Sequence, residues 1–239
     1  METSNPLLKR ETAWSATQPG TANMTLEGTV NKCGILLLLC MGAAAFSWSN
    51  PDLQGLFILG GMLGGLVVCL IGLFKPATTP FTAPLYAVLE GLALGAISQL
   101  TNLRYPGIAT NAFLLTMAVL GLMLFLYATR IIRVTNKLVI GVVIATGAIM
   151  VVYLAEFVLR FFGISMGYLN SSGPIGIGIS LLIVGVAAFN LLVDFAVIEQ
   201  NVRGGAPKYM EWYSGMALLV TLVWLYLEIL RLLSKLRSR

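Results

Sequence analysis

Seven apolar runs divide this 239-residue chain, and they constrain its fold more than any other feature. Crossing about 30 Å of hydrocarbon at 1.5 Å per residue takes roughly 20 helical residues, and most of the runs reach about this length. Short breaks containing Pro, Gly or Asn separate them, as expected between helices. The runs cover residues 33–48, 53–74, 81–100, 108–128, 138–162, 174–198 and 212–233. They predict an all-α polytopic membrane protein, a bundle of seven transmembrane helices with antiparallel neighbours.

Composition supports a membrane protein and excludes several classes of site. The chain is 58% hydrophobic and 10% charged, whereas a soluble domain carries about 25% charged residues. Because there is no histidine, His-based zinc sites and Ser-His-Asp or Cys-His catalysis are excluded. The three cysteines lack C-x-x-C spacing and lie in or beside apolar runs, which indicates buried thiols. We predict no catalytic residue, metal site or cofactor.

Charge distribution indicates topology. The net charge of +5 is spread over short loops and both tails, so the lipid bilayer, and not nucleic acid, is the expected partner. Residues 1–30 are polar and lack a signal-peptide apolar core, which predicts a cytoplasmic N-terminal tail before a transmembrane domain at 31–239. With the N-terminus inside, the inner side receives most Lys and Arg, and the outer loops receive only Arg104 and Arg160. This bias predicts that the N-terminus lies inside, and we expect a multi-pass protein of the cell (inner) membrane.

The first and last runs are less regular. The first is short, and we expect it to extend back through Val30 with Lys32 snorkelling. Seven spans place the basic C-terminal residues outside, against the charge bias, so the last run either crosses the membrane fully or enters and returns. We expect a full span.

Small residues predict close helix packing. Gly61 and Gly65 lie four residues apart on the second run, and Gly91 and Gly95 do so on the third. Such spacing lets helix backbones approach closely in a membrane. We therefore expect the second and third helices to pack against each other through these four glycines.

Carboxylates inside the apolar runs are the strongest functional signal. A charge at the centre of a membrane helix costs ~2.5–3.5 kcal/mol and marks a functional site by default. Four acids fall in such runs: Glu90, Glu156, Asp194 and Glu228. Two of them precede an arginine by one turn, in the pairs Glu156–Arg160 and Glu228–Arg231, for which we expect local ion pairs.

The remaining two acids, Glu90 and Asp194, have no such basic neighbour. Glu90 lies near the middle of its run, where it either lines an ion path or bonds to the adjoining helix. Asp194 lies about four residues, or roughly 6 Å, from the inner end of its run. It is either a functional carboxylate or an interfacial acid solvated by lipid headgroups.

Four segments resemble the Bax inhibitor-1/YccA-like family, also called the transmembrane Bax inhibitor motif family, in its longer bacterial branch. The most distinctive are residues 189–199, which read FNLLVDFAVIE, and residues 222–233, which read LVWLYLEILRLL. Residues 89–95, LEGLALG, are similar to the third-helix motif of the family. Residues 28–32, GTVNK, are similar to the tail before its first helix.

The resemblance implies a seven-helix bundle whose last helix is surrounded by the other six. It also implies a pH-sensitive calcium leak in which two acids on the sixth and seventh helices share a proton. Asp194 matches the first acid, and the second falls at or near Thr221, where this chain has no carboxyl group. Glu228 is about 10 Å farther along the same face and is a poor direct substitute.

Two functions follow as hypotheses. The leading one is a non-enzymatic membrane protein that conducts or modulates a Ca²⁺ leak, with Asp194, Glu90, Thr221 and Glu228 as candidates for the ion path and its gate. The alternative is a regulator of a membrane-bound quality-control protease or of the stress response, without transport. An intramembrane aspartyl protease is disfavoured because it needs two membrane aspartates and only Asp194 is present.

Overall fold

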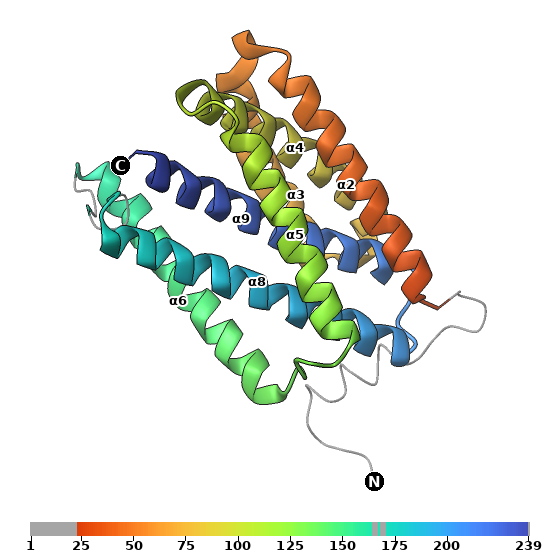
Figure 1. Cartoon of the computed structure of the whole chain (residues 1–239). Coiled ribbons are helices and arrows are strands. Elements are labelled where there is room, and N and C mark those ends of the chain that lie inside the picture. Colours follow the sequence, from red (N-terminus) through yellow and green to blue (C-terminus); the bar gives the residue numbers. More distant parts are fainter. Residues whose placement is uncertain (1–22, 164–166, 168–170, 239) are drawn as a thin grey trace. The chain divides into compact units, whose positions relative to one another are not determined.

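The computed structural model describes residues 23–163, 167 and 171–238 (Figure 1). Seven helices in this part of the chain are long and apolar enough to cross a membrane. They are α2 (Leu26–Trp48), α3 (Gln54–Phe74), α4 (Thr79–Arg104), α5 (Ile108–Ala128), α6 (Asn136–Phe161), α8 (Pro174–Arg203) and α9 (Met210–Arg237). Short 3₁₀ turns, η1 (Pro51–Leu53) and η2 (Pro76–Thr78), precede α3 and α4. The prediction of an all-α protein with seven candidate spans is confirmed.

A capping residue can extend a helix beyond the apolar run that predicted it. Helix α2 begins at Leu26, earlier than expected, because the Thr25 side chain accepts a hydrogen bond from the Gly28 N–H at 3.0 Å. Polar first-turn residues therefore belong to the helix although they contribute nothing to the apolar run. At the other end of the chain, α9 is one unbroken helix of 28 residues.

The chain divides into two compact units, which are described separately. Unit 1 combines the described residues up to Ala96 with Ala196–Leu219. Unit 2 combines Ile97–Phe195 with the described residues from Val220 onward. Helices α4, α8 and α9 each contribute residues to both units.

In unit 1, α3 packs against α4 through glycine. A Cβ built on Gly61 would lie 2.5 Å from the carbonyl oxygen of Leu89, and one on Gly65 would lie 3.1 Å from Glu90 Oε1. Real Cβ atoms do not approach backbone as closely as the Gly61 position requires. Gly61 and Gly65 thus make the contact expected between the second and third spans.

Gly91 and Gly95 pack against a different helix from the one expected. A Cβ on Gly91 would lie 2.3 Å from the Cys40 carbonyl oxygen, and one on Gly95 would lie 2.2 Å from that of Ala44. Both of these partners belong to α2, so the expectation that all four glycines join the second and third spans was wrong for this pair. Helix α4 uses one face for α3 and another for α2.

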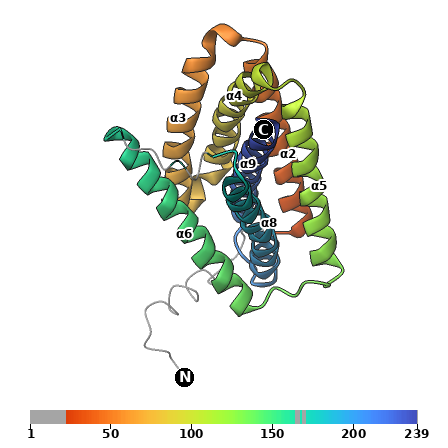
Figure 2. The same cartoon turned by 60° about the vertical axis from the view of Figure 1, so that its left-hand side comes forward.

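Helix α9 has the largest buried share of the seven spans. Half of its most apolar window is buried, compared with 6% for α6. In unit 1 it contacts α3 and α2, where Met216 reaches Gly72 and Gly215 faces Leu36. In unit 2 it bonds to α4, α6 and α8, and it runs beside α8 (Figure 2). A last helix that contacts many others agrees with the expectation drawn from the family resemblance.

Candidate functional site

Two polar contacts fix the pairing of α8 with α9 in unit 2. The Thr221 hydroxyl donates a hydrogen bond to the Asp194 carboxylate. Farther along, Lys235 Nζ donates to Ser180 Oγ at 2.7 Å. Ser180 and Asp194 on α8 are separated by the same number of residues as Thr221 and Lys235 on α9. At helical rise, each separation spans about 21 Å. The helices are therefore antiparallel neighbours over this length.

Asp194 lies in an otherwise apolar part of α8. Its neighbours Leu192 and Phe195 are buried. One carboxylate oxygen, Oδ2, is also buried and has no hydrogen-bond partner among the described residues. A buried carboxylate oxygen without a partner is costly. Asp194 thus combines a bond from Thr221 with a buried oxygen that has no partner among the described residues.

One turn before Asp194, Asn190 connects α8 to α6. Its side-chain amide donates to Thr146 Oγ1 at 2.8 Å and to the Val186 carbonyl oxygen at 3.0 Å. We did not single out Asn190 from the sequence. A polar amide one turn from an intramembrane acid is the signal that could have identified it.

Glu228 forms the local ion pair expected from the sequence. Its carboxylate accepts from Arg231 Nη1 at 3.2 Å, and also from the Tyr153 hydroxyl of α6 at 2.8 Å. Tyr153 in turn accepts from Arg231 at 2.5 Å, so the three side chains form a closed network. The side chain of Glu228 is almost fully buried. Its charge is compensated within this network.

Glu156 also forms its expected pair, with Arg160 at 2.9 Å.

Glu90 belongs to unit 1, whereas Asp194, Thr221 and Glu228 belong to unit 2. The Tyr86 hydroxyl, one turn earlier on α4, donates to the Glu90 carboxylate. Glu90 faces the Gly65 surface of α3.

Glu211 is a buried acid that the sequence interpretation missed. It lies in the first turn of α9, and its side chain is fully buried. Lys32 Nζ lies 2.6 Å from Oε2, and Lys208 Nζ lies 2.8 Å from Oε1. The backbone N–H and the hydroxyl of Thr25 each donate to Oε1 at 3.0 Å. Because Glu211 precedes the last apolar run, the search for acids inside such runs passed over it.

The segments around Glu211 are joined by backbone contacts as well. The Met24 N–H donates to the Ala206 carbonyl oxygen at 2.7 Å, and Asn23 forms an isolated β-bridge with Pro207. Lys32 also lies over the Trp212 ring, 5.6 Å from its centroid. The start of α2 is thus tied to the loop between α8 and α9.

The described residues contain no group of three or more His, Cys, Asp and Glu side chains that could hold a metal ion. The three cysteines form no disulfide.

Comparison with known proteins gives one result. A family model described as Bax inhibitor 1 like matches residues 5–238. Neither the curated proteins nor the solved structures contain a match to the chain.

Proposed function

Since the chain belongs to the Bax inhibitor 1 like family and is a multi-pass membrane protein, we propose that it is a non-enzymatic cation leak protein, with Ca²⁺ as the ion. Asp194 is the gating carboxylate in this proposal. Thr221 is its hydrogen-bond donor on the neighbouring helix.

The observation that carries the proposal is the contact of Asp194 with Thr221. An ionised carboxylate that accepts a hydrogen bond from α9 holds α8 against that helix. Protonation weakens this charge-assisted bond and leaves a neutral group, so the two helices can separate. The buried oxygen Oδ2 supplies a second acceptor position for a passing cation or its water.

The other candidate acids fit this role less well. Glu228 is compensated by Arg231 and Tyr153, so a cation would have to displace an arginine to reach it. Glu90 accepts a hydrogen bond from Tyr86 in unit 1 and serves in this proposal as a structural acid against α3.

Calcium flux into liposomes containing the purified protein and a calcium-sensitive dye tests the proposal. Wild-type flux should rise on acidification, because protonation of Asp194 opens the path. Asp194→Asn should leak at all pH values. Thr221→Val keeps the side-chain shape and removes the donor, a loss of ~1.5–3 kcal/mol for a bond to a charged group. It should increase flux about 10- to 100-fold.

The matched control is Glu199→Gln, which removes a carboxylate five residues along α8 that pairs with Arg203. Its flux should equal that of the wild type. An equal rise in Glu199→Gln and Asp194→Asn would show that negative charge near this helix end, and not the Thr221 contact, controls the leak.

The identity of residue 221 favours a second candidate function. Because Thr221 supplies a hydroxyl where leak-competent relatives are expected to carry an acid, the proton-sharing pair is incomplete. A regulator of a membrane-bound quality-control protease needs no such pair. Absence of flux in the wild type and in both Asp194 and Thr221 variants would remove the leak proposal. Altered turnover of a misfolded membrane protein in cells lacking the chain would then support the regulator.

A further inference from the structure

A polar pocket of about 50 Å³ lies in unit 2, among the end of α6, the start of α8 and the end of α9. Most of its lining is polar, and two isoleucines of α8 complete it. The polar lining residues are Tyr153, Glu156, Arg160, Ser180, Arg231 and Lys235. The proposed Ca²⁺ path does not use this pocket.

Positive charge exceeds negative charge around the pocket. The lining holds three cations and one carboxylate, and Glu228 adds a second carboxylate through its contact with Arg231. The five groups together carry one net positive charge. Lys235 is buried, whereas the Arg160 and Arg231 side chains are 59% and 44% exposed. An incoming anion can therefore reach both guanidinium groups.

The hydrogen bonds around the pocket leave donors for such an anion. Each guanidinium group has five N–H donors, and the described bonds of Arg160 and Arg231 use only some of them. Ser180 accepts from Lys235, so its own hydroxyl hydrogen can be donated. Guanidinium groups bind phosphate oxygens in bidentate geometry.

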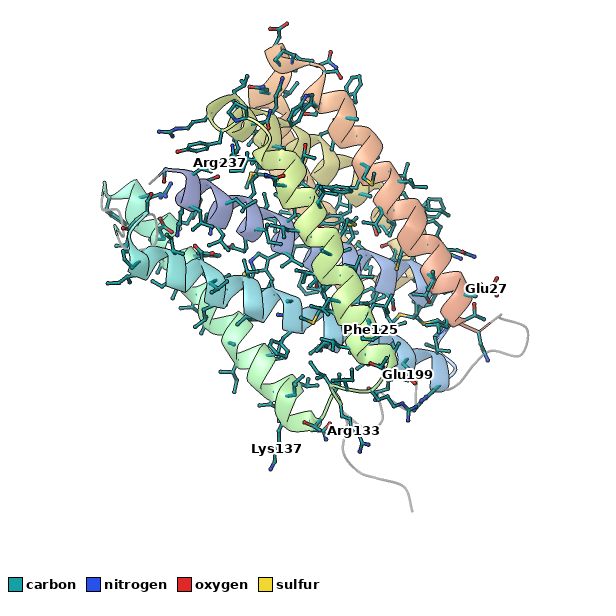
Figure 3. All side chains as sticks on the ribbon, in the orientation of Figure 1. Glu27, Phe125, Arg133, Lys137, Glu199 and Arg237 are labelled. Carbon is teal, nitrogen blue, oxygen red and sulfur yellow. The ribbon has the colours of Figure 1, made fainter. Side chains whose placement is uncertain are left out.

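The pocket lies where three candidate spans end or begin: α6 at Phe161, α8 at Pro174 and α9 at Arg237. In unit 2, Arg237 is at the opposite end from Arg133 and Lys137 (Figure 3). Span ends lie at the depth of the lipid headgroups, where arginine and lysine side chains reach the phosphate layer. The isoleucines Ile179 and Ile183 give the pocket an apolar side.

We propose that this pocket binds an anionic phosphate group, that of an anionic lipid headgroup or of free phosphate. One phosphodiester balances the net charge of the five groups. Arg160 and Arg231 bind its oxygens, and Ser180 donates a hydrogen bond. The site is independent of the Ca²⁺ leak, so either proposal can fail without the other.

Thermal unfolding of the purified full-length protein in uncharged detergent tests the site. Phosphatidylglycerol, phosphatidylcholine and inorganic phosphate are added in separate titrations. Phosphatidylglycerol should raise the unfolding temperature in a saturable way, and phosphatidylcholine should not. Stabilisation by inorganic phosphate as well would identify a site for phosphate from either source, whereas stabilisation by phosphatidylglycerol alone would identify a lipid site. No saturable effect of either anion overturns the proposal.

Two substitutions with opposite expected effects on phosphatidylglycerol binding distinguish a binding site from a purely structural ion pair. Arg160→Gln should weaken phosphatidylglycerol binding about tenfold, the effect of losing one charge-assisted hydrogen bond. Glu156→Gln removes the carboxylate of the same ion pair and should strengthen binding. A purely structural ion pair would make both variants less stable and leave the affinity unchanged, which contradicts the proposal. Arg133→Gln, at the opposite end of unit 2, is the control with an equal charge change and should bind as the wild type does.

Discussion

Glu211 connects two segments that lie far apart in the sequence. Its buried carboxylate joins Thr25 and Lys32 at the start of α2 to Lys208 in the loop before α9. Removing one partner of a buried ion pair costs ~3–5 kcal/mol, because the other charge stays buried without compensation. Space for the carboxylate exists only because residue 28 has no side chain: a Cβ on Gly28 would lie 2.3 Å from Glu211 Oε1.

We therefore expect Gly28→Ala to destabilise the protein, because the methyl group must displace the Glu211 carboxylate from its partners. Overpacking of this kind costs ~1–3 kcal/mol. Gly34→Ala is the matched control on the same helix, since a Cβ built there meets no packing neighbour within 4 Å among the described residues. It should be neutral or should stabilise α2 by ~0.5–1 kcal/mol through helix propensity. Thermal unfolding in detergent measures both, and equal effects of the two substitutions would contradict the assignment.

Glu211→Gln provides a second test at the residue scale. The substitution keeps the shape of the side chain and removes the charge that Lys32 and Lys208 share. We expect a loss of ~3 kcal/mol or more in the free energy of unfolding. Glu27→Gln, an exposed first-turn acid of α2, is the control and should change stability by less than ~0.5 kcal/mol. A similar small effect of Glu211→Gln would mean that the cluster does not stabilise unit 1.

At the scale of helices, glycine determines which surfaces of α4 contact their neighbours in unit 1. Gly91 and Gly95 bring its backbone against the carbonyl groups of Cys40 and Ala44 on α2. Dispersion between closely spaced backbones is the main attraction available to helices in lipid. Loss of this close approach should separate α2 from α4.

Gly95→Ala should consequently destabilise the protein by ~1–3 kcal/mol, because its methyl group meets backbone atoms that cannot move independently. Gly60→Ala is the control, since a Cβ on this α3 residue meets no packing neighbour within 4 Å in the part of the chain that the structure describes. It should be slightly stabilising through helix propensity. Unfolding temperatures in detergent compare the two, and an unchanged value for Gly95→Ala would show that α2 and α4 do not need this close approach.

At the scale of the whole chain, seven spans predict that the two termini lie on opposite sides of the membrane. The excess of Lys and Arg on one side predicts that the N-terminus lies in the cytoplasm. Within unit 2, the separation of Arg237 from Arg133 and Lys137 agrees with a last helix that runs away from the α5–α6 connection (Figure 3).

Cysteine labelling in intact cells measures this orientation. In a variant without the three native cysteines, Ser4→Cys should be protected from a membrane-impermeant reagent and Ser238→Cys should react. Labelling of position 4 would reverse the predicted orientation. Protection of position 238 as well would place both termini inside and would contradict seven full spans.

Local features of this protein could be read from its sequence. The seven helices follow from the lengths of the apolar runs. The ion pairs Glu156–Arg160, Glu199–Arg203 and Glu228–Arg231 follow from residues one turn apart on a single helix. Both kinds of feature depend only on helical geometry. Asp194 and Thr221 could be paired beforehand only through the family resemblance.

The tertiary structure alone decided which side chains meet across helices. The partners of Glu211, the Asn190–Thr146 bond and the α2-facing surface formed by Gly91 and Gly95 depend on the rotation of each helix about its axis. In a soluble protein the apolar stripe of a helix reveals that rotation. In a membrane protein the surface that faces lipid is as apolar as the surface that faces other helices. Hydropathy therefore located the spans in the sequence but could not determine which face of each one packs inward.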